Sequence, residues 1–386
     1  MSDFILKEKN GPIPVLIIDT INFCNYSCIM CPQGNMREKN HGIMDFELFK
    51  KIIDELTTPP QKARVIIPFW NGEPSLYPNF AESLEYASLK KKEFPDAWEV
   101  WSLHTNFSLI NEEVSQKIIK SGLFGPITVS LDAVKENTYA KIRRGGNLSN
   151  VLGNIKDYLR IRHEFNKEFP SLTIQIIVME ENFDEVIDFI DYWKEEFQKY
   201  SIIPNIIYDE CHGMEKDCIF IRRCMADKPE KQSFLDEIHK KAIIKAGLIE
   251  EDFNEKIVQT DEFIKTSDIE EEKQHKDIKK RRIPCVGLWQ HFGIRYDGET
   301  SACCRDFNCE MNLGNIKDSS LWQIWNSEKL HDFRKYHIAG LFENIKICHY
   351  CTGQPFGVLE KNFLESYLKS TGDYEKFKKD IEIIWS

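Results

Sequence analysis

The stretch "NFCNYSCIMCP" at residues 22–32 places three cysteines, Cys24, Cys28 and Cys31, within eight positions. A structural zinc site needs four ligands and a disulfide framework needs an even number of cysteines, so three thiols satisfy neither. Three thiolates on one loop can instead bind three irons of a cubane 4Fe–4S cluster and leave the fourth iron open. The alternative is a three-cysteine zinc site completed by a distant histidine, such as His41 or His104.

The chain contains 12 cysteines, and their interpretation depends on the compartment. No signal peptide is visible, and no apolar run approaches the roughly 18 to 20 residues that a membrane span needs. We therefore expect a cytoplasmic protein without a membrane association. In a reducing compartment, metal binding or catalysis explains many cysteines better than disulfides do.

The composition describes an acidic globular protein. Of 386 residues, 42% are hydrophobic and 29% are charged, and the formal net charge is −11. A nucleic-acid-binding protein normally presents a basic face to the phosphates, so we expect no nucleic-acid partner. The basic run "KKRR" at 279–282 is typical of the solvated end of a charged helix.

Between residues 13 and 208, short β-branched runs alternate with amphipathic helical patterns. Because parallel neighbours need a crossover connection, this alternation predicts βαβ units in a parallel sheet. The expected fold is α/β, a partial (β/α)6 TIM-like barrel that is open or partly closed. The predicted strands are 14–20, 63–70, 98–105, 126–132, 172–179 and 201–208, and the predicted helices are 45–56, 78–91, 111–122, 134–142, 149–165 and 183–198.

The rest of the chain differs in character, so we expect four segments. The barrel occupies residues 1–208, and residues 209–282 form a helical insertion or linker without a convincing strand. A small cysteine-rich unit follows at 283–352, with a hairpin around the Asp297-Gly298 turn, and residues 353–386 form a helical tail.

The spacing C-x3-C-x2-C directly after the first strand resembles the radical S-adenosylmethionine (radical SAM) enzymes, whose signature is C-x3-C-x-aromatic-C. One departure is Met30, which stands where most members carry an aromatic residue that contacts adenine; a methionine sulfur can also pack on a purine face. The resemblance implies a 4Fe–4S cluster on Cys24, Cys28 and Cys31, with S-adenosylmethionine on the open iron. Its reductive cleavage would give a 5′-deoxyadenosyl radical that abstracts a hydrogen from the substrate.

Other loops match the family in the same order, over about residues 14 to 208. The resemblance implies cofactor-binding roles, with the amino group at "NGEP", the cofactor carboxylate at Arg143, and the ribose near Asn182. Taken singly, each of these polar residues fits a structural role about as well. The implied cofactor-binding positions are Met30, Gly72, Glu73, Pro74, Thr105, Asn106, Ser130, Asp132, Arg143, Gln175 and Asn182.

A second cysteine set lies near the C-terminus, where "CHYC" at 348–351 has chelating C-x2-C spacing. With "IRYDGETSACCRD" and "LGNIKDSSLWQIWNS", it resembles the SPASM domain and its shorter Twitch form. The resemblance implies a fully ligated auxiliary 4Fe–4S cluster suited to electron transfer. The implied ligands are Cys285, Cys303, Cys348 and Cys351, and the alternative is a four-cysteine zinc ribbon.

Five cysteines stay without an assigned role. The family pattern favours Cys303 over its neighbour Cys304, since adjacent cysteines point opposite ways on a strand. Cys309 is a spare. One cysteine of the insertion could donate hydrogen to a substrate radical, as in radical epimerases, although a buried inert thiol is the commoner case. The cysteines of the insertion are Cys211, Cys218 and Cys224.

The resemblance implies a radical SAM oxidoreductase whose auxiliary cluster takes up an electron from the substrate. Only 23 residues precede Cys24, which favours a small substrate, such as a sugar or cyclitol, over a peptide. A flavodoxin or ferredoxin would supply electrons. The alternatives are a peptide-modifying enzyme or epimerase, or a non-catalytic iron–sulfur or zinc protein.

Overall fold

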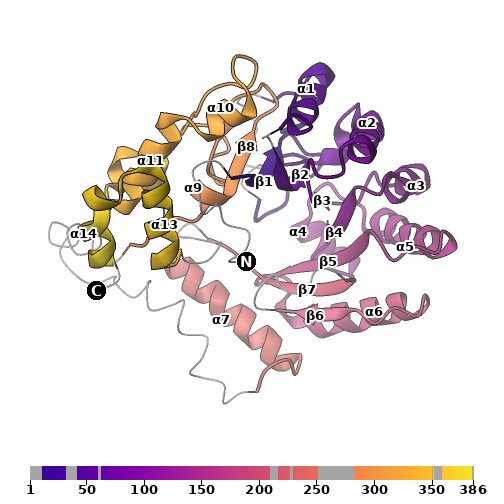
Figure 1. Cartoon of the computed structure of the whole chain (residues 1–386). Helices are drawn as coiled ribbons and strands as arrows, with labels where there is room; N and C mark the ends of the chain where they lie inside the picture. The colour runs from indigo at the N-terminus through magenta and orange to yellow at the C-terminus, as the bar shows by residue number, and fades with distance from the viewer. Residues whose placement is uncertain are drawn as a thin grey trace.

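The computed structural model describes residues 11–31, 41–59, 62–208, 216–226, 229–250, 282–349, 351 and 359–384. Its centre is a curved nine-stranded sheet in the order β6-β7-β5-β4-β3-β2-β1-β8-β9, which does not close into a full barrel (Figure 1). All neighbours pair in parallel except the final pair. The strands are β1 (Ile13–Ile18), β2 (Ala63–Ile67), β3 (Val100–Thr105), β4 (Phe124–Ser130), β5 (Ser171–Val178), β6 (Asn205–Ile207), β7 (Cys218–Arg223), β8 (His291–Ile294) and β9 (Thr300–Ser301).

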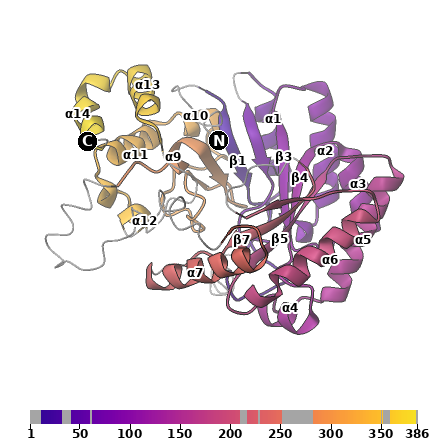
Figure 2. The same cartoon turned by 90° about the horizontal axis from the view of Figure 1, so that it is seen from below.

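Helices follow the first strands in alternation and cover the outer face of the sheet (Figures 1 and 2). They are α1 (Phe46–Leu56), α2 (Phe80–Glu93), α3 (Glu112–Ser121), α4 (Glu136–Ile142), α5 (Leu148–Glu164) and α6 (Val186–Gln198). In α1 the Asp45 side chain accepts the amides of Glu47 and Leu48, which otherwise have no partner within the helix. The predicted partial barrel is confirmed.

One sequence prediction is wrong: the segment 209–282 does contain a strand. Residues 218–223, "CIFIRR", form β7, which pairs with β5 and separates it from β6. Arg162 holds Asp217 at the start of this strand through two bonds of 2.8 and 2.9 Å, and Asp217 also accepts the Leu172 amide. The sequence pattern did not predict this strand because its short apolar run lies between charged segments. Residues 251–281, the most charged part, lie outside the described residues.

The C-terminal part extends the sheet of the barrel. The predicted hairpin is present as β8 and β9, and β8 pairs in parallel with β1. Helices then gather beside β8, on the side opposite α1 to α6 (Figure 2). They are α9 (Gly287–Gln290), α10 (Leu321–Trp325), α11 (Glu328–Ile338), α12 (Lys346–His349), α13 (Lys361–Thr371) and α14 (Tyr374–Ile384), while α7 (Pro229–Lys245) follows β7. Across the described ranges, no helix has the length and apolar character needed to cross a membrane.

Trp70 joins the two parts of the molecule. Its indole packs on Gly293 of β8, and its Nε1–H donates to the Cys304 carbonyl at 2.8 Å. Trp70 and Cys309 form a small apolar cluster with Val15 and Ile17, on the concave face of β1. The segment 304–309 therefore covers that face of β1 and β2.

This junction leads to a stability prediction. A Cβ at position 293 would lie 2.6 Å from the Trp70 ring, which its hydrogen bond holds in place. We expect Gly293→Ala to lower the free energy of unfolding by about 1–3 kcal/mol, the usual cost of overpacking. The matched control is Gly153→Ala in α5, where a Cβ meets nothing within 4 Å and a gain of about 0.5–1 kcal/mol is expected. Denaturant unfolding of both variants measures the difference, and equal stabilities would contradict this packing.

Candidate iron–sulfur and cofactor site

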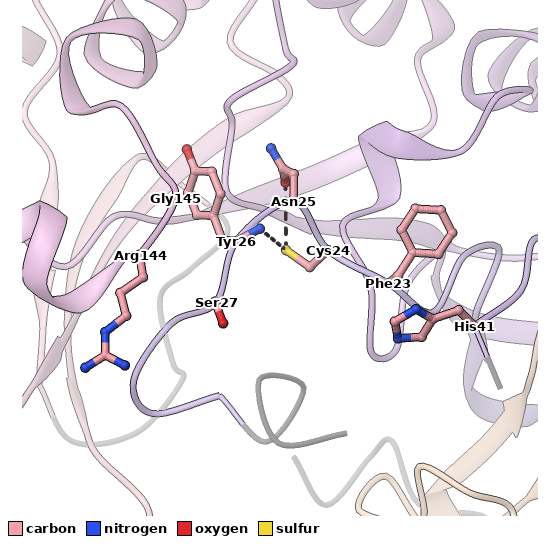
Figure 3. Close-up of a pocket in the computed structure, with 8 residues that line it drawn as sticks. All are labelled: Phe23, Cys24, Asn25, Tyr26, Ser27, His41, Arg144 and Gly145. Carbon is pink, nitrogen blue, oxygen red and sulfur yellow. Dashed lines mark hydrogen bonds between the residues drawn. The ribbon is translucent and has the colours of Figure 1, made fainter. Parts of the chain in front are cut away.

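The three-cysteine loop leaves the carboxyl end of β1, where ligands gather in parallel α/β sheets. Cys28 is buried, and Cys24 and Cys31 are half-buried. A pocket of about 620 Å³ opens beside the loop, and Figure 3 shows the Cys24 sulfur in its wall. The pocket is lined by Phe23, Cys24, Asn25, Tyr26, Ser27, His41, Arg144 and Gly145.

N–H groups are directed at two of the three sulfurs. Cys24 Sγ accepts from the Tyr26 amide at 3.3 Å and from Asn106 Nδ2 at 3.7 Å, and Cys28 Sγ accepts from Arg143 Nη1 at 3.5 Å. Burial raises the pKa of Cys24 to about 12, so this thiol needs a positive charge to ionise. Iron supplies such a charge, and N–H donors then stabilise the ligated thiolates. The donor set therefore fits an iron–sulfur cluster.

The zinc alternatives of the sequence are not assembled in the structure. In the part of the chain that is described, no three His, Cys, Asp or Glu side chains converge on a common metal position. His104 packs against Phe69 with ring centroids 4.8 Å apart, and His41 lies beside Phe23. A cubane cluster does not need such convergence, because each thiolate binds a different iron.

Glu73 connects three of the predicted loops. Its carboxylate is buried and accepts from Thr105 Oγ1 at 2.6 Å, Ser75 Oγ at 2.6 Å and the Asn106 amide at 2.7 Å. Its own amide donates to the Phe23 carbonyl, so it also binds the cysteine loop. Burial raises the pKa of Glu73, and the hydrogen bonds partly offset this. Pro74 follows as the first residue of a short 3-10 helix, Pro74–Leu76.

Gly72 allows these loops to meet. A Cβ at this position would lie 2.0 Å from the carbonyl oxygen of Ile21 and 2.8 Å from that of Phe23. Both contacts are with backbone, which cannot move away as a side chain can. The backbone of "NGEP" therefore lies directly against the backbone of the cysteine loop.

A buried ion pair lies behind Cys28. Arg143 Nη2 and Asp132 Oδ2 are 2.6 Å apart, and Asp132 Oδ1 accepts the Ile177 amide at 2.7 Å. Burial raises the pKa of Asp132, while the Arg143 charge lowers it. Asn182 donates to the Asp132 carbonyl and accepts the Met179 amide, so it ties the loop after β5 to the loop after β4. The roles of Arg143 and Asn182 towards the cofactor stay predictions.

Polar side chains share the concave face of β3, β4, β5 and β7. The register aligns Ser130 with Gln175, and Gln175 Oε1 accepts from Arg222 Nη1 at 3.3 Å. Burial and the Arg222 charge lower the pKa of the neighbouring His104 to about 4, so this imidazole is neutral near pH 7. Sequence reasoning missed Arg222 because it missed β7.

Asp19 is a second residue that the sequence analysis missed. It follows β1, is fully buried, and its Oδ1 accepts the amides of Trp70 and Asn71 at 3.2 and 3.1 Å. Burial raises its pKa to about 7. The only sequence signal was an acidic residue at the end of an apolar strand.

The four cysteines of the second set, all among the residues that the structure describes, lie between β8 and α12, close enough for their charges to affect one another, although they do not converge on one metal position. Burial, and then the charges of Cys303 and Cys351, raise the pKa of Cys285 to about 11. The pKa of Cys348 is likewise raised by burial and by the charges of Cys303, Cys285 and Cys351. The hydrogen bond from Cys304 lowers the pKa of Cys303, and the choice of Cys303 as the cluster ligand stays a prediction. Cys304 contacts the barrel through its carbonyl, and its thiol pKa is raised.

The other cysteines lie apart from this set. Cys309 packs against β1, and Cys218 is buried in β7 with its sulfur 3.3 Å from Thr173 Oγ1. Cys224 follows β7 and shares an apolar cluster with Met30 of the cysteine loop. Cys211 lies outside the described residues.

Comparison with known families decides the assignment. A model described as the radical SAM superfamily matches residues 18–193, and a model described as an iron–sulfur cluster-binding domain, SPASM, matches residues 285–352. The chain is a radical SAM enzyme with a C-terminal SPASM domain. This membership implies a 4Fe–4S cluster, S-adenosylmethionine and auxiliary iron–sulfur chemistry.

Relatives of this radical SAM enzyme differ in what they act on. A tungsten-containing aldehyde ferredoxin oxidoreductase cofactor-modifying protein of Pyrococcus furiosus is 23% identical over 83% of this chain and 82% of its own. A GTP 3′,8-cyclase of Clostridium botulinum is 28% identical over 52% of this chain and 58% of its own. These identities leave the reaction open.

Two solved structures show the same fold. anSMEcpe with bound AdoMet has a TM-score of 0.55 at 17% identity, covering 96% of this chain and 99% of its own. Streptococcus suis SuiB bound to its precursor peptide SuiA has a TM-score of 0.53 at 16% identity, covering 86% and 68%. At these identities the likeness is one of fold.

Gly72 provides a test of the loop contact. We expect Gly72→Ala to displace the cysteine loop, because the new methyl group would meet backbone oxygens at 2.0 and 2.8 Å. The iron content after anaerobic reconstitution should fall from about eight to about four per chain, with the auxiliary cluster retained. Gly153→Ala is the control. Full iron content in Gly72→Ala would show that this contact does not position the loop.

Asp19 gives a pH prediction for the cluster-free protein. Its folded-state pKa of about 7 lies above the ordinary 3.8, so between these values the folded state binds more protons than the unfolded state. Stability should therefore fall as pH rises from about 4 to 7. Asp19→Asn keeps the Oδ1 acceptor without the charge and should remove most of this fall. Denaturant unfolding across this pH range measures it, with the exposed Asp96→Asn as control; parallel curves for all three proteins would refute the burial effect.

Proposed function

We propose that this enzyme is a radical SAM oxidoreductase that abstracts hydrogen from a small polar substrate, such as a sugar or cyclitol, with the auxiliary cluster taking up an electron. The observation that carries the proposal is the set of N–H donors directed at Cys24 and Cys28, beside the buried Glu73. Such an arrangement serves ligated thiolates and has no evident purpose for inert thiols.

The residues of the barrel would divide the work. Cys24, Cys28 and Cys31 would hold the cluster, and Glu73 would set the position of the loop on which they lie. The chemistry that a bound, reduced cluster would supply is one electron for the reductive cleavage of S-adenosylmethionine to methionine and a 5′-deoxyadenosyl radical. The protein's own contribution is orientation and exclusion of water and competing hydrogen donors.

The concave face of the sheet supports a small polar substrate. His104, Gln175 and Arg222 offer donors and acceptors on this face. The segment 304–309 covers the same face over β1 and β2. The uncovered part is thus lined by groups that can bond hydroxyl or carboxylate groups.

Peptide modification is the second candidate within the class. SuiB was solved with a precursor peptide and anSMEcpe with the Cp18Cys peptide, and both share this fold. Epimerisation would need a hydrogen donor, and Cys224, beside Met30, is the best-placed cysteine for that role. An electron donor such as flavodoxin or ferredoxin would serve either reaction.

The cleavage reaction is the first test. Protein reconstituted with iron and sulfide, reduced with dithionite and given S-adenosylmethionine should release 5′-deoxyadenosine, and iron should measure about eight per chain. Cys28→Ala should abolish the product, because the cluster loses a ligand. Cys218→Ala, a buried cysteine of β7, is the matched control and should keep it. No product from the fully loaded protein would favour a non-catalytic iron–sulfur protein.

The substrate class needs a separate experiment. Candidate sugars, cyclitols and peptides, each deuterated at carbon, would be incubated with the reduced enzyme, and 5′-deoxyadenosine would be examined for deuterium by mass spectrometry. We expect transfer from a small polar compound, and weaker transfer with Arg222→Met than with Arg223→Met, whose side chain lies on the opposite face of β7 and pairs with Asp236. Transfer from peptides alone would overturn the small-substrate proposal while leaving the cleavage reaction intact.

A further inference from the structure

His337 lies on the buried face of α11, among the auxiliary cysteines. Ser327 caps this helix, and its buried residues recur at helical spacing: Leu330, His331, Arg334, His337 and Ile338. The pattern is that of an ordinary core helix, so the sequence gives no hint that one of its histidines contacts a cysteine.

The two ring nitrogens of His337 contact two cysteines that lie far apart in the sequence. The amide of Cys285 donates to Nδ1 at 3.1 Å, and Nε2 lies 3.3 Å from Sγ of Cys348. Because Nδ1 accepts a hydrogen bond, a neutral ring must carry its proton on Nε2. His337 therefore donates Nε2–H to the sulfur of Cys348.

Neighbouring groups hold the ring in this orientation. Phe342 packs edge-on against it, with centroids 4.7 Å apart. The guanidinium of Arg282 lies 3.9 Å above the Phe342 ring, and Arg282 Nη1 donates to the Cys348 carbonyl at 2.7 Å. The ring is fully buried, so water does not compete for the Nε2–H group.

We infer that His337 is a positioning residue for the auxiliary cluster, donating a hydrogen bond to the Cys348 thiolate that raises the cluster's reduction potential. Reduction adds negative charge to a cluster, and a donor on a ligand sulfur stabilises that charge. A higher potential makes the cluster a better acceptor of the substrate's electron. The inference rests on the proposed assignment of Cys348 as a ligand.

The test isolates the auxiliary cluster in the full-length chain. Cys24→Ala, Cys28→Ala and Cys31→Ala together remove the first cluster, so that the auxiliary cluster gives the only signal in a redox titration followed by electron paramagnetic resonance. In this background, His337→Leu should shift the midpoint potential to a more negative value. His337→Gln, which restores a side-chain N–H donor, should lie close to the parent.

His331→Leu is the matched control, because His331 is also buried in α11 but contacts Tyr367 at 2.6 Å. It should leave the potential unchanged. An unchanged potential in His337→Leu at full iron content would overturn the inference. His337→Leu could also lose its iron while His331→Leu keeps it. In that case His337→Gln, which retains an N–H donor, should still bind iron. Loss of iron from His337→Gln as well would overturn the inference.

The ligand assignment fails in a different way. If Cys348→Ala in the same background keeps about four irons per chain, Cys348 is not a ligand and the proposed auxiliary site is wrong. Iron content thus tests the site, and the potential tests the hydrogen bond.

Discussion

The buried carboxylate of Glu73 is the constraint on which the site depends. A carboxylate without solvent must be fully hydrogen-bonded, and Glu73 obtains its partners from two loops, at Ser75 and at Thr105 and Asn106. Its backbone adds a bond to the cysteine loop, which Gly72 allows to approach. The ends of β1, β2 and β3 are therefore fixed together, and the cysteines lie on a positioned loop.

A small number of contacts also joins the SPASM domain to the barrel. The parallel pairing of β8 with β1 continues the sheet, and Trp70 connects β2 to Gly293 and Cys304. β1 leads into the first cysteine loop, and it also pairs with β8 of the hairpin that precedes Cys303. A displacement of β1 would therefore shift the positions of both sets of cysteines.

Sequence reasoning reached the barrel and the cysteines because their signals are local. Alternating strand and helix periods predict a parallel sheet, and the spacing of Cys24, Cys28 and Cys31 predicts a cluster with an open position. It failed at β7, where six residues between charged segments gain their identity only from pairing with β5. Arg222 and His337 were missed for a similar reason: each contact joins residues more than ten positions apart. Such contacts depend on the three-dimensional fold, and no periodic pattern in the sequence indicates them.

In the proposed mechanism, the three-cysteine loop leaves one iron of the cluster open for the cofactor. Electron–nuclear double resonance of the reduced enzyme, with S-adenosylmethionine carrying ¹⁵N at its amino group, tests this most directly. We expect a ¹⁵N coupling to the cluster that is absent in Cys28→Ala. A fully loaded, reduced cluster without such a coupling would contradict it.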